Sequence, residues 1–306
     1  LVRSRGLGDV YKRQNSIFNI SSKRSLHMNN HIYQPMLFNP DIDIQTKSLT
    51  KINKYGTTKV HENMYIYESA SNTSANIINS MYSALVPSTH TEWIIGYNHT
   101  DNKSSFYCIG PVVKKCTYDF GNYEHYFGVC FDDIYSYYAK GVNADTYPSG
   151  MTGEVYEYSP SEGSYEYKLI EDFKTSCSFE KHIHMFKAFL ENAKQCCYIP
   201  DNMITLTDII KKAYGNILIS ELATSLGYSE RHIQRMFNEV LGMSPKDYCK
   251  IIRFQNVLYN MLSDCRQNNS GYISGLGYSD QAHFQREFKS FTGLTPRHFL
   301  MQFKPV

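Results

Sequence analysis

A motif that occurs twice near the C-terminus constrains this chain more than any other feature of its sequence. The first copy contains Gly227-Tyr228-Ser229, Arg235, Phe237, Gly242 and Pro245, and the second contains Gly277-Tyr278-Ser279, Arg286, Phe288, Gly293 and Pro296. From its first glycine to its proline, the first copy spans 18 steps and the second spans 19. An internal repeat of this kind indicates that one supersecondary unit is specified twice.

The first copy predicts a helix-turn-helix unit. Its apolar residues recur at helical spacing on both sides of Gly227. We therefore expect a helix over 219–226, a turn at Gly227, and a second helix over 230–241 that Ser229 caps and Gly242 ends. In such units the second helix lies in the DNA major groove. The outward side chains of this second helix are rich in hydrogen-bond donors, which suits base edges and phosphates.

The second copy predicts an equivalent helix over about 280–292, capped by Ser279. The helix before it would contain Gly271 and Gly275, each of which costs about 1 kcal/mol relative to alanine in a helix interior. We therefore expect that preceding helix to be short or frayed. Between the copies, the apolar pattern over 245–263 predicts a helix about 28 Å long. That length could hold two DNA-reading helices near the pitch of successive major grooves, about 34 Å.

Residues from about 201 to 304 resemble the DNA-binding domain of the AraC/XylS family of bacterial transcription regulators. The resemblance is carried by the run 277–289, by Gly293-Leu294-Thr295-Pro296, and by Arg253, which is similar to the arginine of the family's linker helix. It implies seven helices, with two helix-turn-helix units joined by the linker helix. Carried over by position, the residues that read bases are Arg231, Gln234 and Arg235 in the first unit, and Gln281, Gln285 and Arg286 in the second.

The two DNA-reading helices, 230–241 and 280–292, are called here the first and the second reader. We expect Arg235 to read a base, because its helix has strong flanking signals. For Arg286 we expect a weaker, phosphate-like contribution, since Gly271 and Gly275 weaken the helix that should brace the second reader. The sequence also departs from the family at Ala282, where members often carry a larger polar group.

Charge divides the chain into three parts. Residues 1–27 contain six Lys and Arg against one Asp or Glu, residues 28–199 contain 13 against 19, and residues 200–306 contain 12 against 9. Because phosphate contacts dominate the affinity of proteins for DNA, nucleic acid should meet the C-terminal part. We expect a non-native or disordered tail at 1–27, a β-rich sensor or dimerisation domain at 28–195, a linker at 196–202 and the DNA-binding domain at 203–306.

The middle of the chain alternates short apolar segments with turn residues. The segments 93–97, 105–111 and 126–131 favour strands, because they are rich in aromatic and β-branched residues and are bounded by Gly, Pro, Asn and Asp. A helical pattern returns at 179–190. The predicted fold class is therefore α+β: a β-rich, cupin-like barrel with a trailing helix, followed by an all-α domain. In strand pattern and domain order, this arrangement resembles the sensor of the same regulator family.

The function that we expect is sequence-specific, DNA-binding transcription regulation, of the activator type and in the cytoplasm. The expected partners are double-stranded DNA and RNA polymerase, with a small-molecule effector and a homodimer as further possibilities at the N-terminal domain. We expect no enzyme activity, no cofactor, no metal and no membrane partner. Two alternatives remain: a cupin-type metal-binding enzyme, and a ligand-independent dimerisation module, either of them fused to a DNA-binding domain.

Several polar residues bear on these alternatives. His90, Glu92 and His99 lie around a predicted strand and are candidate metal ligands, although His99 falls on the opposite parity. His182 and His184 diverge by about 200° on a helix, so we interpret them as surface or helix-packing residues. The many tyrosines could line a ligand pocket or fill the core.

The cysteines give no metal-binding or secretory signature. None of the eight forms a Cys-x-x-Cys pair, which favours reduced thiols in a cytosol. The adjacent Cys196-Cys197 could respond to redox conditions or metalloids, with ordinary packing as the alternative. The sequence contains no run of eighteen apolar residues, so it predicts no membrane span.

Overall fold

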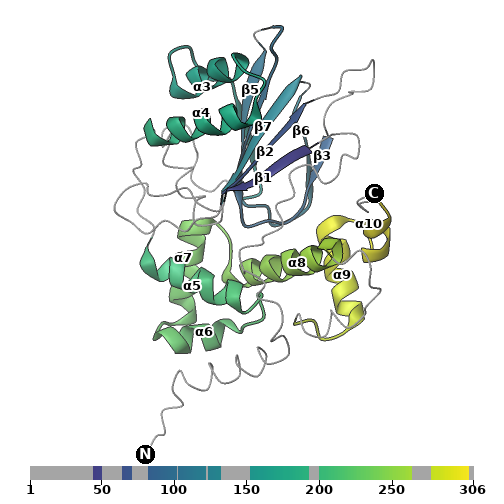
Figure 1. The fold of residues 1–306 in the computed structure, drawn as a ribbon. Coiled ribbons are helices and arrows are strands. Elements are labelled where there is room, and N and C mark those ends of the chain that lie inside the picture. Colours follow the sequence, from purple (N-terminus) through teal and green to yellow (C-terminus); the bar gives the residue numbers. More distant parts are fainter. Residues whose placement is uncertain are drawn as a thin grey trace, which may run out of the picture.

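The computed structural model describes residues 44–49, 64–70, 82–101, 103–121, 123–131, 152–192, 200–263 and 277–302. The predicted tail at 1–27, the pair Cys196-Cys197, and the glycines Gly271 and Gly275 lie outside the described residues. The described chain has a β-rich N-terminal part and a helical C-terminal part (Figure 1). This arrangement confirms the predicted α+β class.

Antiparallel strands form two sheets in the N-terminal part. The strands are β1 (Ile44–Leu49), β2 (Met64–Ala70), β3 (Tyr82–Leu85), β4 (Thr91–Tyr97), β5 (Ser104–Ile109), β6 (Cys116–Asp119), β7 (His125–Phe131) and β8 (Val155–Tyr158). The larger sheet has the order β1-β2-β7-β4-β5-β8, and β3 pairs with β6 in the smaller one. β4, β5 and β7 confirm the three predicted strands. Among the described strands the larger sheet is open, with β1 and β8 at its edges.

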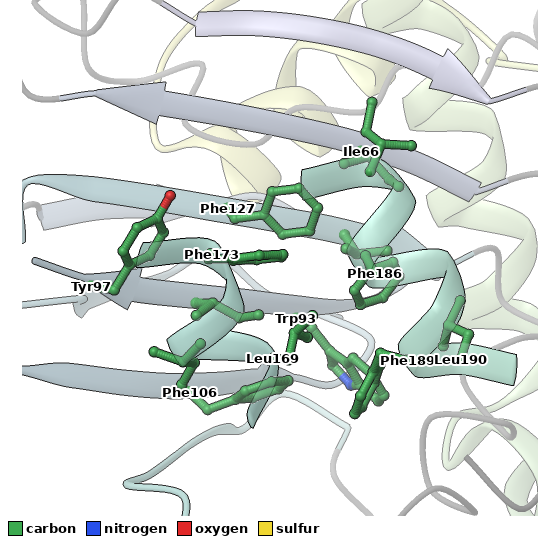
Figure 2. Packing of buried hydrophobic residues seen from close by; sticks show 14 of the residues in the cluster. Ile66, Trp93, Tyr97, Phe106, Phe127, Leu169, Phe173, Phe186, Phe189 and Leu190 are labelled. Carbon is green, nitrogen blue, oxygen red and sulfur yellow. The ribbon is translucent and has the colours of Figure 1, made fainter. Parts of the chain in front are cut away.

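The central strand β4 is buried on both faces. Trp93 and Ile95 belong to a cluster between the sheet and two helices, α3 (Tyr165–Lys174) and α4 (Phe179–Asn192) (Figure 2). Ile94 belongs to a second cluster, which includes Phe120 and Tyr126. A strand covered on both faces reads as a continuous apolar run, which is the pattern of Trp93-Ile94-Ile95.

The helix α4 confirms the trailing helix that the sequence predicts, whereas α3 was not predicted. Ser164 caps α3, since its side chain accepts a hydrogen bond from the Tyr167 backbone N–H at 3.1 Å. Leu169, Ile170 and Phe173 form its buried face. These three residues follow the 3.6-residue period, so the helical signal was present in the sequence.

Six helices make up the described C-terminal part. They are α5 (Asp201–Lys212), α6 (Ile219–Leu226), α7 (Glu230–Leu241), α8 (Pro245–Ser263), α9 (Gln281–Thr292) and α10 (Pro296–Gln302). The helix expected between α8 and α9 falls in 264–276, outside the described residues. Within the described residues, no helix is both long and apolar enough to cross a bilayer.

The helix α8 belongs to two separate cores. Its first half contributes Tyr248 and Ile252 to a cluster with α5, α6 and α7. Its second half contributes Phe254 and Leu258 to a cluster with α9 and α10. One continuous helix therefore connects the two helix-turn-helix regions, as the sequence predicts.

Candidate nucleic-acid interface

The first reader, α7, begins and ends at the residues that the sequence predicts. Gly227 adopts φ 69° at the end of α6, in the left-handed region that favours glycine. The Ser229 side chain accepts a hydrogen bond from the His232 backbone N–H at 3.2 Å and so caps α7. Gly242, with φ 68°, ends the helix. The turn between α6 and α7 is thus fixed by local chemistry.

The two faces of α7 differ sharply in polarity. Its buried face consists of Ile233, Met236, Phe237, Val240 and Leu241. The candidate residues Arg231, Gln234 and Arg235 are all exposed. At 100° per residue they lie within about a quarter of the helix circumference. The structure therefore brings the three side chains together on one accessible strip.

The Arg235 guanidinium has only weak partners. Its Nη2 lies 3.2 Å from His232 Nδ1, and its Nε lies 3.8 Å from Glu239 Oε1. Both side chains of the Arg235–Glu239 pair are about two-thirds exposed, at 65% and 66%. Exposed i,i+4 pairs contribute only about 0.3–0.5 kcal/mol. Such a pair gives way readily to a stronger anionic or base partner.

The second reader, α9, is capped by Asp280, so the predicted Ser279 cap is wrong. Asp280 Oδ1 accepts a hydrogen bond from the His283 backbone N–H at 2.7 Å. That bond, aided by Ser279, lowers the pKa of the Asp280 carboxyl. The Ser279 hydroxyl instead donates to Asp280 Oδ2 at 3.1 Å. A carboxylate accepts both bonds, and its charge suits a helix N-terminus.

The extra residue of the second copy explains this shift. It lies between Gly277 and the start of α9, so the two readers align when counted back from the glycines that end them, Gly242 and Gly293. The cap Ser229 then corresponds to Asp280. The candidate residues align as Gln234 with Gln285 and Arg235 with Arg286, but Arg231 corresponds to Ala282, and Gln281 corresponds to Glu230.

The candidate residues of the second reader are also accessible. Gln281, Gln285 and Arg286 are all exposed on α9. Its buried face contains Phe284 and Phe288. Because Ala282 occupies the place of Arg231, this second exposed strip has one guanidinium fewer at the N-terminal turn.

Arg253 of α8 braces the second reader from within the protein. Its Nη2 donates to both oxygens of Glu287 on α9, at 3.2 and 3.1 Å. The two side chains are only 12% and 10% exposed. The guanidinium also lies over the Tyr278 ring, 4.7 Å from the centroid, which is within cation–π range. Sequence resemblance identified Arg253 but not its partners, because Glu287 lies 34 residues away.

The three candidate metal ligands do not come together. His90 immediately precedes β4 and contacts Ser88 Oγ at 2.7 Å, whereas His99 follows the strand at its other end. Seven residues of strand separate these ends by roughly 20 Å. Glu92 pairs with Ile109 and Cys130 at the His90 end. Across the described ranges, no group of three His, Cys, Asp or Glu side chains is placed to hold a metal ion.

His182 of α4 forms a buried contact that sequence reasoning missed. Its side chain is 1% exposed, and its Nδ1 lies 2.6 Å from Glu68 Oε1 on β2. Its Nε2 lies 2.7 Å from the Ser176 carbonyl and 3.1 Å from that of Phe173. The two carbonyls and the Glu68 carboxylate are hydrogen-bond acceptors, so this arrangement favours the protonated imidazole, in which both ring nitrogens donate.

The pKa of His182 is raised by this arrangement. Burial by itself lowers it, but the hydrogen bond and charge of Glu68, together with the two carbonyl oxygens, outweigh burial. The Tyr97 hydroxyl donates to the same carboxylate at 3.2 Å. Glu68 therefore joins β2, β4 and α4 at one end of the sheet.

Comparison with known proteins bears on the C-terminal helices. The model of a family described as "Helix-turn-helix domain" matches residues 222–302. The chain is 25% identical over 150 residues to the Msm operon regulatory protein of Streptococcus mutans, in an alignment that covers 49% of this chain and 46% of that protein. The chain therefore matches less than half the length of this curated relative.

The structure of this chain has low TM-scores against two solved structures. ToxT of Vibrio cholerae is 12% identical, with a TM-score of 0.43, over 78% of this chain and 98% of that one. A probable AraC family transcriptional regulator from Rhodopseudomonas palustris is 26% identical, with a TM-score of 0.31, over 35% of this chain and 100% of that one. The family match coincides with the repeated motif and confirms the resemblance read from it. Over residues 222–302, the C-terminal part of this chain is a helix-turn-helix domain.

Proposed function

We propose that this chain is a sequence-specific regulator of transcription that binds double-stranded DNA. α7 and α9 would lie in successive major grooves. The observation that carries the proposal is the pair of equivalent, exposed polar strips, one on each reader, with α8 between them. A guanidinium such as that of Arg235 or Arg286 can pair bidentately with guanine or hold a phosphate.

The N-terminal part would carry regulation. We propose that its sheets and the α3–α4 pair receive a small molecule or a partner protein, and that they support a homodimer. We further propose that the protein contacts RNA polymerase, activates transcription and acts in the cytoplasm. The domain order supports it, because the reader helices and the β-rich part occupy separate stretches of the chain.

The first test compares Arg235→Ala with Arg286→Ala on a library of randomised sites at two salt concentrations. Arg235→Ala should cost roughly 1–3 kcal/mol of binding free energy at the preferred site and relax the preference at one position. Arg286→Ala should have a smaller effect that is similar for all sequences, and should reduce the salt slope by about one. The missing counterpart of Arg231 at Ala282 supports this ranking.

Lys168→Ala is the matched control, because it removes one exposed cation from α3, far along the chain from both readers. It should leave both the base preference and the salt slope unchanged. A larger change in base preference for Arg286→Ala than for Arg235→Ala would reverse the ranking. If the wild-type protein selects no sequence at low salt, the proposed function itself is wrong.

A further inference from the structure

Side chains of the N-terminal part contact the same structural position in both readers. Each reader ends at a glycine in the left-handed conformation, Gly242 in α7 and Gly293 in α9. Thr152 lies against the first glycine, and Lys115 lies against the second. Both copies of the repeated motif are thus contacted by the N-terminal part, through two residues that are 37 positions apart in the sequence.

At the first reader the contact is a helix-end hydrogen bond. The Thr152 hydroxyl donates to the Leu241 carbonyl at 3.0 Å. That carbonyl belongs to the last turn of α7, where backbone oxygens lack helical partners. A Cβ placed on Gly242 would collide with Thr152 Oγ1. The close approach therefore depends on glycine for space as well as for its backbone conformation.

At the second reader the contact is the close approach of a lysine side chain to Gly293. Lys115 is exposed, and its Nζ would lie 2.8 Å from a Cβ placed on Gly293. An ammonium beside the C-terminal end of a helix is favoured by the partial negative charge there. The N-terminal part thus places a cation where α9 can attract it.

Between the readers, the segment that leads from β3 to β4 is anchored on α8. Val86 is 7% exposed and belongs to the same apolar cluster as Phe254 and Phe288. The next residue, Pro87, accepts a hydrogen bond from Gln255 Nε2 at 2.5 Å. Gln255 is itself only 5% exposed. A buried amide bonded across 168 residues of sequence fixes α8 relative to the β-rich part.

We propose that the N-terminal part positions the two readers relative to each other, and so sets the spacing between the two DNA segments that the chain accepts. The proposal rests on the proposed function. Its basis is that the N-terminal part contacts three helices of the C-terminal part. Thr152 contacts the end of α7, Lys115 contacts the end of α9, and the Val86–Pro87 segment packs on α8. Each contact is weak alone, but together they restrict how far α8 can bend or α9 can turn.

A matched pair of glycine variants tests the contact at the first reader. Gly227 and Gly242 both end helices, with φ 69° and 68°, but a Cβ on Gly227 would meet nothing within 4 Å. Alanine at either position therefore introduces the same backbone strain, and only Gly242→Ala also displaces Thr152. Gly242→Ala should lower the urea midpoint of the full chain more than Gly227→Ala does. Adding Thr152→Ala should remove that excess.

A matched pair of lysine variants tests the contact at the second reader. Lys114 and Lys115 are both exposed neighbours in the same loop. Lys115→Glu places a negative charge at the end of α9, whereas Lys114→Glu makes the same change of net charge beside it. The readout is binding to a DNA library in which the separation of the two recognised segments varies one base pair at a time.

The expected result is a broader spacing preference in Gly242→Ala and Lys115→Glu than in Gly227→Ala and Lys114→Glu. At the best wild-type spacing, the first two should bind roughly tenfold more weakly, a size typical of coupled contacts. Their binding at neighbouring spacings should change less. If the wild-type protein binds and all four variants keep its spacing preference, this inference is overturned while the proposed function stands. A wild-type protein that binds no DNA overturns both.

Discussion

The Arg253→Met variant is expected to lose roughly 3–5 kcal/mol of unfolding free energy, because removing one partner of a buried ion pair leaves the other charge uncompensated. The side chains of Arg253 and Glu287 are 12% and 10% exposed, so water screens the remaining carboxylate poorly. The variant also loses the cation–π contact with Tyr278. Urea unfolding followed by circular dichroism measures the loss.

Lys250→Met provides the matched control on the same helix. Lys250 pairs with Asp247 at 3.2 Å, but these side chains are 38% and 46% exposed. Exposed pairs contribute about 0–1 kcal/mol, so this variant should remain near the wild-type stability. The double variant Arg253→Met/Glu287→Met should recover much of the loss, since it leaves no unpaired charge. Equal destabilisation by Arg253→Met and Lys250→Met would contradict the assigned role of Arg253.

In DNA binding, Arg253→Met should affect the second reader more than the first. Its partners Glu287 and Tyr278 hold α9 and the turn before it, whereas α7 packs on the other half of α8. We therefore expect base preference to weaken at the positions read by Gln285 and Arg286 and to persist at those read by Arg235.

The first reader could be predicted almost residue by residue, because its signals are local. Ser229, Gly227 and Gly242 act through hydrogen bonds and backbone conformations that involve only neighbours along the chain. The apolar residues of 245–263 likewise identified α8, since they recur at helical spacing along the whole segment. A helix predicted from local caps and apolar spacing forms in the folded protein when tertiary packing favours the same conformation.

Prediction from sequence was weaker where two local solutions compete. Ser279 and Asp280 are both good helix caps, and only the distance to Gly293 shows which of them is used. α3 escaped prediction although Leu169, Ile170 and Phe173 follow a helical period, because its tyrosines at 165 and 167 favour strands in isolation. Packing against the sheet decides the outcome for this helix.

Contacts between distant segments could not be predicted at all. Glu68 meets His182 across 114 residues, and Pro87 meets Gln255 across 168. No spacing rule connects such pairs, because they result from the order of the strands and from the way the helices pack. The same holds for Thr152 and Lys115, whose place at the ends of the readers depends on the arrangement of the whole chain.

His182→Leu is the second variant with a large expected effect, and the effect should depend on pH. At neutral pH and below, we expect a loss of roughly 3–5 kcal/mol, because the Glu68 carboxylate loses its cationic partner and keeps the bond from the Tyr97 hydroxyl, while two carbonyls lose their donor. His184→Leu is the matched control: His184 is exposed, two residues along the same helix. It should change stability by no more than about 0.5 kcal/mol.

The sign of the pH dependence follows from the raised pKa of His182. The folded protein holds this proton more tightly than the unfolded chain, whose histidines titrate near 6.5. The stabilisation is therefore complete below that value and is lost as pH rises through the folded pKa. His125 acts in the opposite direction, since burial, and then the charge of His99, lower its pKa and it resists protonation.

The charge of His182 also lowers the pKa of His125, so the difference between wild type and His182→Leu reports the His182 proton together with its coupling to His125. That difference in unfolding free energy should be largest at about pH 5 and should shrink toward about pH 9. It should keep a residual part at high pH, since a neutral imidazole still packs against Phe173 and donates one hydrogen bond. Glu68→Gln should shift the decline to lower pH, because it removes the charge that raises the pKa of His182. A difference that stays flat, or grows with pH, would show that His182 is neutral in the folded protein and that Glu68 does not hold its proton.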